Sequence, residues 1–198
     1  GPGVSTVRLV NPDLDVEAAR TAYARAGFVI LRDFLAPETA EVLAETLTAE
    51  LPWELWSRGP DGTVVVAPDR WARMDSQARA SLVPPPPSSV EAFHYAYERV
   101  APRGDEADPG LRALAAFRQA LNGRPYLDLL GRITGTSAGT RVEGAWSRYG
   151  PGHFLSPHTD ANRDQIRLAA HVLGLTRDWA SGWGGHLSLC TPEGDREA

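Results

Sequence analysis

The chain contains no lysine: all 20 basic residues are arginine, and Cys190 is the only cysteine among 198 residues. A single cysteine excludes an intramolecular disulfide and a cysteine-rich zinc site, and it fits a reducing cytoplasm. No apolar run approaches the roughly 20 residues that span a bilayer, and no secretory signal is visible, so we expect no membrane partner. The missing lysine, with abundant alanine, glycine and proline, is typical of a GC-rich coding sequence and favours a bacterial source.

The overall balance of charge is mildly acidic. A net charge of −5 argues against a nucleic-acid partner, which needs a concentrated positive field, although a local arginine patch stays open. Hydrophobic residues make up 42% of the chain, and its length suffices for a sizeable core. We therefore expect a single domain over residues 4–198, with residues 1–3 a remnant of tag cleavage.

The pattern of apolar residues and turn signals predicts helices first and strands later. A glycine follows the first helix and Asp108 precedes the fourth, as helix caps commonly do. Residues 59–62 (GPDG) form a turn signal between two short strands. The expected helices are 15–26, 37–51, 90–100, 109–121 and 125–133, and the expected strands are 28–34, 53–56, 63–66, 141–149, 166–173 and 186–190. This order predicts an α+β protein.

The most informative pair of residues is His158 and Asp160. In an extended strand the side chains of residues i and i+2 point to the same side, so both can reach one metal ion. An imidazole and a carboxylate, with a second histidine, make the facial triad of non-haem Fe(II) oxygenases. The spacing alone is weak evidence, because about 0.6 such matches are expected by chance from 5 histidines and 25 acidic residues.

The surrounding motifs strengthen the case. Residues 149–152 (YGPG) precede the pair, an apolar strand with Arg167 follows it, and then come residues 175–179 (LTRDW) and 183–187 (WGGHL). This order resembles the prolyl-hydroxylase branch of the Fe(II)- and 2-oxoglutarate-dependent dioxygenases. The resemblance covers roughly the last fifty residues closely and the rest loosely.

The resemblance implies a role for each matched residue. His158 and Asp160 would bind iron and form the catalytic centre. Tyr149 matches the tyrosine whose hydroxyl contacts 2-oxoglutarate, although a core tyrosine would give the same pattern. Arg167 matches an arginine near the mouth of the site, and it could equally be the partner in a structural ion pair.

The resemblance also implies the fold and the chemistry. The fold would be a double-stranded β-helix, or jelly roll, with the N-terminal helices packed on it. The protein would be an oxidoreductase that uses Fe(II), 2-oxoglutarate and O2, with ascorbate as a reductant, to hydroxylate a C–H bond. The expected substrate is a prolyl residue in a protein or peptide, or an amino acid, and the oligomeric state is not readable.

Two residues that the family needs are not found. The third iron ligand, a histidine, and the basic residue that pairs with the far carboxylate of 2-oxoglutarate belong to later strands. Arg196 comes too early to match. We therefore expect the C-terminal strands of the barrel to be missing from this sequence.

Other interpretations stay open. A degenerate barrel that binds without catalysis would explain the missing ligand, whereas a cupin-like isomerase would carry an additional histidine nearby. His171 or His186 could substitute as a ligand, although both, like His153, fit ordinary roles. Another set of residues could line the mouth of the site or pack the helices on the sheet: Trp53, Trp56, Trp71, Arg70 and Arg73.

Overall fold

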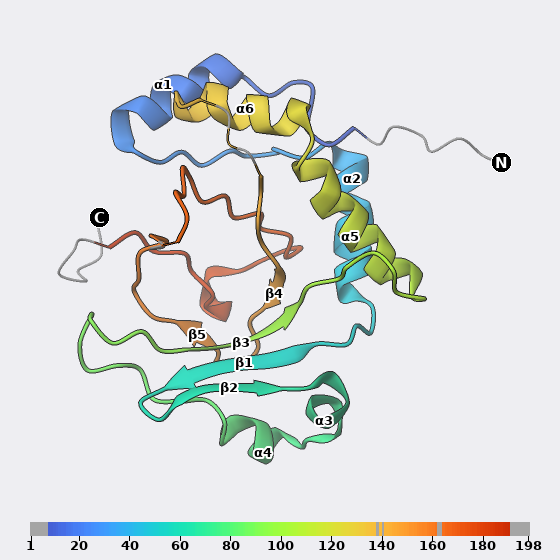
Figure 1. The fold of residues 1–198 in the computed structure, drawn as a ribbon, viewed down its shortest axis with the longest axis vertical. Coiled ribbons are helices and arrows are strands. Elements are labelled where there is room, and N and C mark those ends of the chain that lie inside the picture. The colour runs from blue at the N-terminus through green and yellow to red at the C-terminus, as the bar shows by residue number, and fades with distance from the viewer. Residues whose placement is uncertain (1–7, 138, 140, 162–163, 191–198) are drawn as a thin grey trace. The chain divides into compact units, whose positions relative to one another are not determined.

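The computed structural model describes residues 8–137, 139, 141–161 and 164–190, which fall into two compact units. The helical unit comprises Gly1–Glu50, Pro102–Gly144 and Asn162–Arg177, and the sheet unit comprises Leu51–Ala101, Ala145–Ala161 and Asp178–Ala198. The elements are α1 (Val16–Ala26), α2 (Pro37–Thr48), β1 (Glu54–Gly59), β2 (Gly62–Val66), α3 (Pro68–Arg73), α4 (Ser76–Ala80), β3 (Tyr95–Val100), α5 (Pro109–Leu121), α6 (Arg124–Thr134), β4 (Trp146–Arg148), β5 (Phe154–Leu155) and the 3-10 turn η1 (Ser181–Trp183) (Figure 1).

The helical unit is built from α1, α2, α5 and α6. Helix α1 packs on α6 and α2 packs on α5, as Figure 1 shows. The Asp15 side chain caps α1 by accepting from the Ala18 amide, and Asp108 caps α5 in the same way at Leu111. Gly27 ends α1 with a φ of 77°, a conformation that glycine adopts without strain. The helices predicted in this part of the chain are therefore confirmed.

The sheet unit holds an open antiparallel sheet in the order β2-β1-β3-β4, with β5 also paired to β3. The predicted turn joins β1 to β2, and the hairpin closes at the pair Gly59↔Gly62. Gly62 has a φ of 110°, which strongly favours glycine at this position. The structure is thus a mixed α+β fold with a small open sheet, and the jelly roll stays a prediction.

The two faces of this sheet differ in character. One face carries Leu55, Ala96 and Glu98, all buried, and α3 packs on it through the buried Trp71. Because side chains alternate along a strand, Trp56, Tyr95 and Tyr97 lie on the other face. We call this second surface the aromatic face; it also includes Arg58 and Arg99, which occupy alternate positions of the same strands.

Several predicted elements are wrong. Residues 90–100 do not form a helix: β3 occupies Tyr95–Val100, because pairing with β1 and burial of alternate side chains outweigh local helix propensity. Residues 28–34 are irregular, with one bridge beside them at Val10↔Leu35, and only Trp146–Arg148 of the strand expected over 141–149 forms. The strands expected over 166–173 and 186–190 also do not form: within the described residues neither segment is paired with another strand, and only Cys190 takes part in a single bridge.

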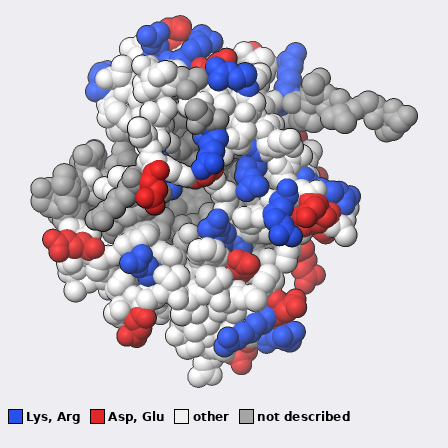
Figure 2. Space-filling view, viewed as in Figure 1, with Lys and Arg blue, Asp and Glu red and all other residues white. Residues whose placement is uncertain are grey.

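No helix among the described residues is both long and apolar enough to cross a membrane. On the face drawn in Figure 2, arginine and acidic side chains are interspersed, so charges of both signs lie close together. Such mixing gives a weak net field. The expectation that nucleic acid is not a partner stays a prediction.

Candidate active site

The pairing of β3 with β4 and β5 places the candidate site residues. Glu98 lies opposite Arg148, and pairing resumes where Ala96 lies opposite Phe154. Residues 150–153 are therefore looped out of the ladder between the two strands. The loop is a tight turn: the His153 amide donates to the Gly150 carbonyl at 3.0 Å, and Gly152 has a φ of 79° that strongly favours glycine.

The side chain of His153 also closes this turn. The Gly150 amide donates to Nδ1 of His153 at 2.9 Å, so the ring is held in the tautomer that carries its proton on Nε2. Burial lowers the pKa of His153, while the carboxylate of Glu98 opposes that shift. A neutral ring is therefore part of the folded loop.

Beyond β5 the chain is tied back to the start of β3. The Ser156 amide donates to the His94 carbonyl at 3.0 Å, and the His94 amide donates to the Ser156 hydroxyl at 3.0 Å. Ser156 is buried, with 5% of its surface exposed. This double link holds the backbone immediately before His158.

The same serine orients the imidazole of His158. Nδ1 of His158 lies 2.9 Å from the Ser156 carbonyl, which can only accept, so Nδ1 is the protonated nitrogen. The lone pair of Nε2 is left for another partner, and Nε2 lies 3.5 Å from Oδ1 of Asp160. Two ligands about 2.1 Å from one divalent ion, in adjacent octahedral positions, lie about 3 Å apart. The structure thus brings His158 and Asp160 together, with their donor atoms slightly farther apart than two ligands of one ion.

A row of aromatic rings connects His158 to Tyr149 along the aromatic face. The ring of Phe93 lies 4.9 Å from that of His158 and 5.1 Å from that of Tyr95. The row continues from Tyr95 to Tyr97 at 5.4 Å and from Tyr97 to Tyr149 at 5.5 Å, where the two rings are stacked. Burial, with a smaller contribution from Tyr97, raises the pKa of Tyr149 to about 12. Its hydroxyl is therefore a neutral donor at physiological pH.

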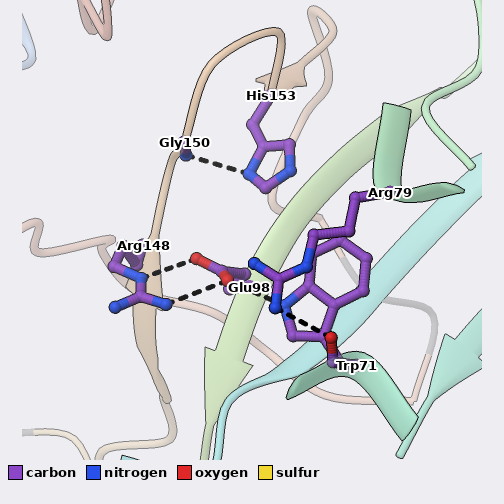
Figure 3. Close-up of polar contacts among 6 residues, drawn as sticks. All are labelled: Trp71, Arg79, Glu98, Arg148, Gly150 and His153. Atoms are coloured by element: carbon purple, nitrogen blue, oxygen red, sulfur yellow. Dashed lines mark hydrogen bonds and ion pairs between the residues drawn. The ribbon is translucent and has the colours of Figure 1, made fainter. Parts of the chain in front are cut away.

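The opposite face of the sheet holds a buried carboxylate that the sequence analysis missed. Glu98, with 4% of its surface exposed, accepts from Nε of Arg148 at 2.6 Å, from Nη2 of Arg148 at 2.9 Å and from the Trp71 indole at 2.8 Å (Figure 3). Burial raises the pKa of Glu98, but the hydrogen bonds from Arg148 and Trp71 outweigh it and leave the pKa below its ordinary value. The alternation of aromatic residues at positions 93, 95 and 97 is the sequence signal that could have located this strand.

The other predicted residues take separate places. Arg167 belongs to the helical unit, as does His171, whose Nδ1 bonds the hydroxyl of the buried Tyr126. Nε2 of His186 donates to the Ser181 carbonyl at 2.9 Å. Within the described ranges, no group of three histidine, cysteine or acidic side chains is arranged to hold a metal.

The tryptophans divide between packing and the aromatic face. Trp53 and Trp71 are buried, so for these two the packing interpretation is confirmed. Trp56 is half-buried on the aromatic face, with the Arg99 guanidinium 4.5 Å above its ring.

No protein-family model, curated protein or solved structure matches this chain.

The two histidines with lowered pKa values predict a loss of stability in mild acid. Burial is the main cause of lowering for both His153 and His171, so below about pH 6.5 the unfolded chain binds more protons than the folded chain. The free energy of unfolding should then fall as the pH drops from 7 to 5, by up to about 1.4 kcal/mol per pH unit for each group. Urea unfolding at several pH values measures this slope. The variants His153→Gln and His171→Gln should each reduce it, and an unchanged slope in both would contradict the prediction.

Proposed function

We propose that this chain belongs to a non-haem Fe(II)- and 2-oxoglutarate-dependent dioxygenase that hydroxylates a C–H bond. The observation that carries the proposal is the pair His158 and Asp160: their donor atoms lie 3.5 Å apart, and the Ser156 carbonyl fixes the tautomer that leaves Nε2 free. A ligating histidine in proteins commonly has its other ring nitrogen held in this way. The ordered motifs from Tyr149 to residue 187 support the same interpretation.

Each residue has a role in the proposal. His158 and Asp160 supply two of the three protein ligands to Fe(II), which together with 2-oxoglutarate and O2 supplies the oxidising chemistry. Tyr149, which keeps its proton at physiological pH, donates a hydrogen bond to a carboxylate of 2-oxoglutarate. For Arg167, which lies in the helical unit, the role near the mouth of the site rests on the resemblance alone. Because the described residues hold no third donor group, we expect the remaining ligand outside them.

The finer expectations belong to the same proposal. The fold is a jelly roll, and the open sheet of β1 to β5 is one of its two sheets. The substrate is a prolyl residue of a protein or peptide, or an amino acid, with ascorbate as an auxiliary reductant. The single cysteine supports a reducing compartment such as the cytoplasm.

A second candidate is a binding module without catalysis. The observation that favours it is the same lack of a third donor group among the described residues, since two protein ligands alone hold Fe(II) weakly. In this case the aromatic face and the pair His158 and Asp160 would bind a ligand and turn nothing over.

Succinate formation separates the two candidates. We expect the protein, incubated in air with Fe(II), 2-oxoglutarate and ascorbate, to release succinate, and prolyl peptides to increase the rate. NMR of the reaction mixture measures succinate and any hydroxylated peptide, with a metal-free sample as the control. No succinate, together with no bound Mn(II) signal in the electron paramagnetic resonance spectrum, would contradict the dioxygenase and support the binding module, because two protein ligands alone hold a divalent metal weakly.

A further inference from the structure

The ion pair between Glu98 and Arg148 is held on the covered face of the sheet by aromatic rings. The Arg148 guanidinium lies 4.5 Å above the ring of Trp53, and the Arg79 guanidinium lies 4.5 Å above the ring of Trp71. Trp71 in turn donates to Glu98, so the carboxylate receives hydrogen bonds from two elements, β4 and α3 (Figure 3). The pair therefore has one well-defined geometry.

This pair fixes which residues of β4 lie on the aromatic face. Glu98 lies opposite Arg148 in the antiparallel pair. Their neighbours on the side of the loop 150–153 are Tyr97 and Tyr149, and because side chains alternate, both of these lie on the other face of the sheet. Their rings are stacked at 5.5 Å with 24° between their planes. A slip of one residue between β3 and β4 would turn Tyr149 to the covered face and bring Arg148 onto the aromatic face.

A buried ion pair is weak evidence for stability, because well-packed apolar residues of the same size are often as good or better. A slip of one residue would separate the forked guanidinium from a carboxylate with 4% exposure, so the pair favours the observed register. Strand β4 spans only Trp146–Arg148, and residues 150–153 are looped out beside it.

We infer that Glu98 is a positioning residue: through Arg148 it determines where the hydroxyl of Tyr149 lies. The contact of that hydroxyl with 2-oxoglutarate rests on the proposed function, whereas the placement of the ring by Glu98 does not. His153 constrains the chain on the C-terminal side of Tyr149, because its ring accepts a hydrogen bond from the Gly150 amide and closes the turn that follows Tyr149.

Fluorine NMR of the protein labelled with 3-fluorotyrosine tests the placement without any measurement of activity. The chain has five tyrosines, and the Tyr149→Phe variant assigns the signal of interest. In Glu98→Gln we expect the Tyr149 signal to shift or broaden, while those of Tyr23 and Tyr126 in the helical unit stay in place. Glu106→Gln is the control, since Glu106 in the helical unit also accepts two hydrogen bonds, from the Arg103 and Gly104 amides, and the Tyr149 signal should stay in place in this variant.

The second measurement is the KM for 2-oxoglutarate, which we expect to rise about tenfold in Glu98→Gln with a smaller change in kcat. A shifted signal with an unchanged KM would keep the placement and overturn the contact between Tyr149 and 2-oxoglutarate. If Glu98→Gln does not fold, Arg148→Lys keeps the charge and removes the fork, and the same shift is expected. An unchanged Tyr149 signal in a folded Glu98→Gln or Arg148→Lys protein would overturn the inference.

Discussion

The variants His158→Ala and Asp160→Asn should each lose at least about 100-fold in affinity for Mn(II) and release no measurable succinate. Loss of a partner that merely orients a ligand already costs 10- to 100-fold, roughly, and a ligand itself contributes more. Both changes leave the link between Ser156 and His94 in place, so the backbone of the segment should hold. Titration followed by electron paramagnetic resonance measures the affinity without the chemistry of Fe(II).

Two residues of the sheet unit provide matched controls for these variants. His186→Ala removes a histidine whose Nε2 bonds the Ser181 carbonyl, and Asp178→Asn replaces an aspartate at a φ of 50°, a conformation that asparagine tolerates. Both controls should bind Mn(II) and release succinate as the unaltered protein does. Equal affinity in His158→Ala and the unaltered protein would remove His158 from the ligand set and, with it, the main support for the proposed function.

The local signals in the sequence predicted the helices and the hairpin well. Asp15, Asp108 and Gly27 act through hydrogen bonds and backbone angles within a few residues, so the sequence contains the whole cause. The hairpin around residues 59–62 is equally local, because its turn residues and its two strands are contiguous.

The failures arise where the structure depends on distant residues. Residues 90–100 include good helix formers, and only pairing of β3 with β1, some forty residues earlier, makes Tyr95–Val100 a strand. The segments 166–173 and 186–190 fail for the opposite reason, since their apolar residues favour strands but within the described residues neither segment pairs with another strand. Pairing partners far apart in the chain leave no mark on the local pattern.

The candidate site shows the same division. Spacing alone predicted that His158 and Asp160 share one side of the chain, and their donor atoms do lie 3.5 Å apart. Glu98 could not be found in this way, because a glutamate in an exposed strand position and one bonded to Arg148 in the core look alike in sequence. A side chain that acts through a partner fifty positions away is therefore harder to predict from sequence than a pair of residues two positions apart.

The ion pair of Glu98 and Arg148 should dominate the stability of the sheet unit when only one partner is removed. Arg148→Met leaves the Glu98 carboxylate buried with only the indole of Trp71 as a donor. Removing one partner of a fully buried pair costs about 3–5 kcal/mol, and because the Arg148 side chain is 47% exposed we expect about 2–3 kcal/mol. Urea unfolding at neutral pH measures this loss. Arg99→Met is the control: it removes an arginine stacked on Trp56 and should lower the free energy of unfolding by about 1 kcal/mol or less.

Two further measurements identify the cause of that loss. The double variant Glu98→Met with Arg148→Met should recover most of the stability, since it leaves no charge unpaired.

Lowering the pH should also reduce the difference in free energy of unfolding between Arg148→Met and the unaltered protein. In the unaltered protein the pKa of Glu98 lies below its ordinary value, so its contribution is present above pH 4.5 and is lost as the pH falls through the lowered value. In Arg148→Met, burial without the arginine instead raises the pKa of Glu98, and protonation then removes the cost of its buried charge. If the difference in free energy of unfolding between the two proteins stays constant from pH 7 to pH 4, lost packing and not the charge destabilises the variant.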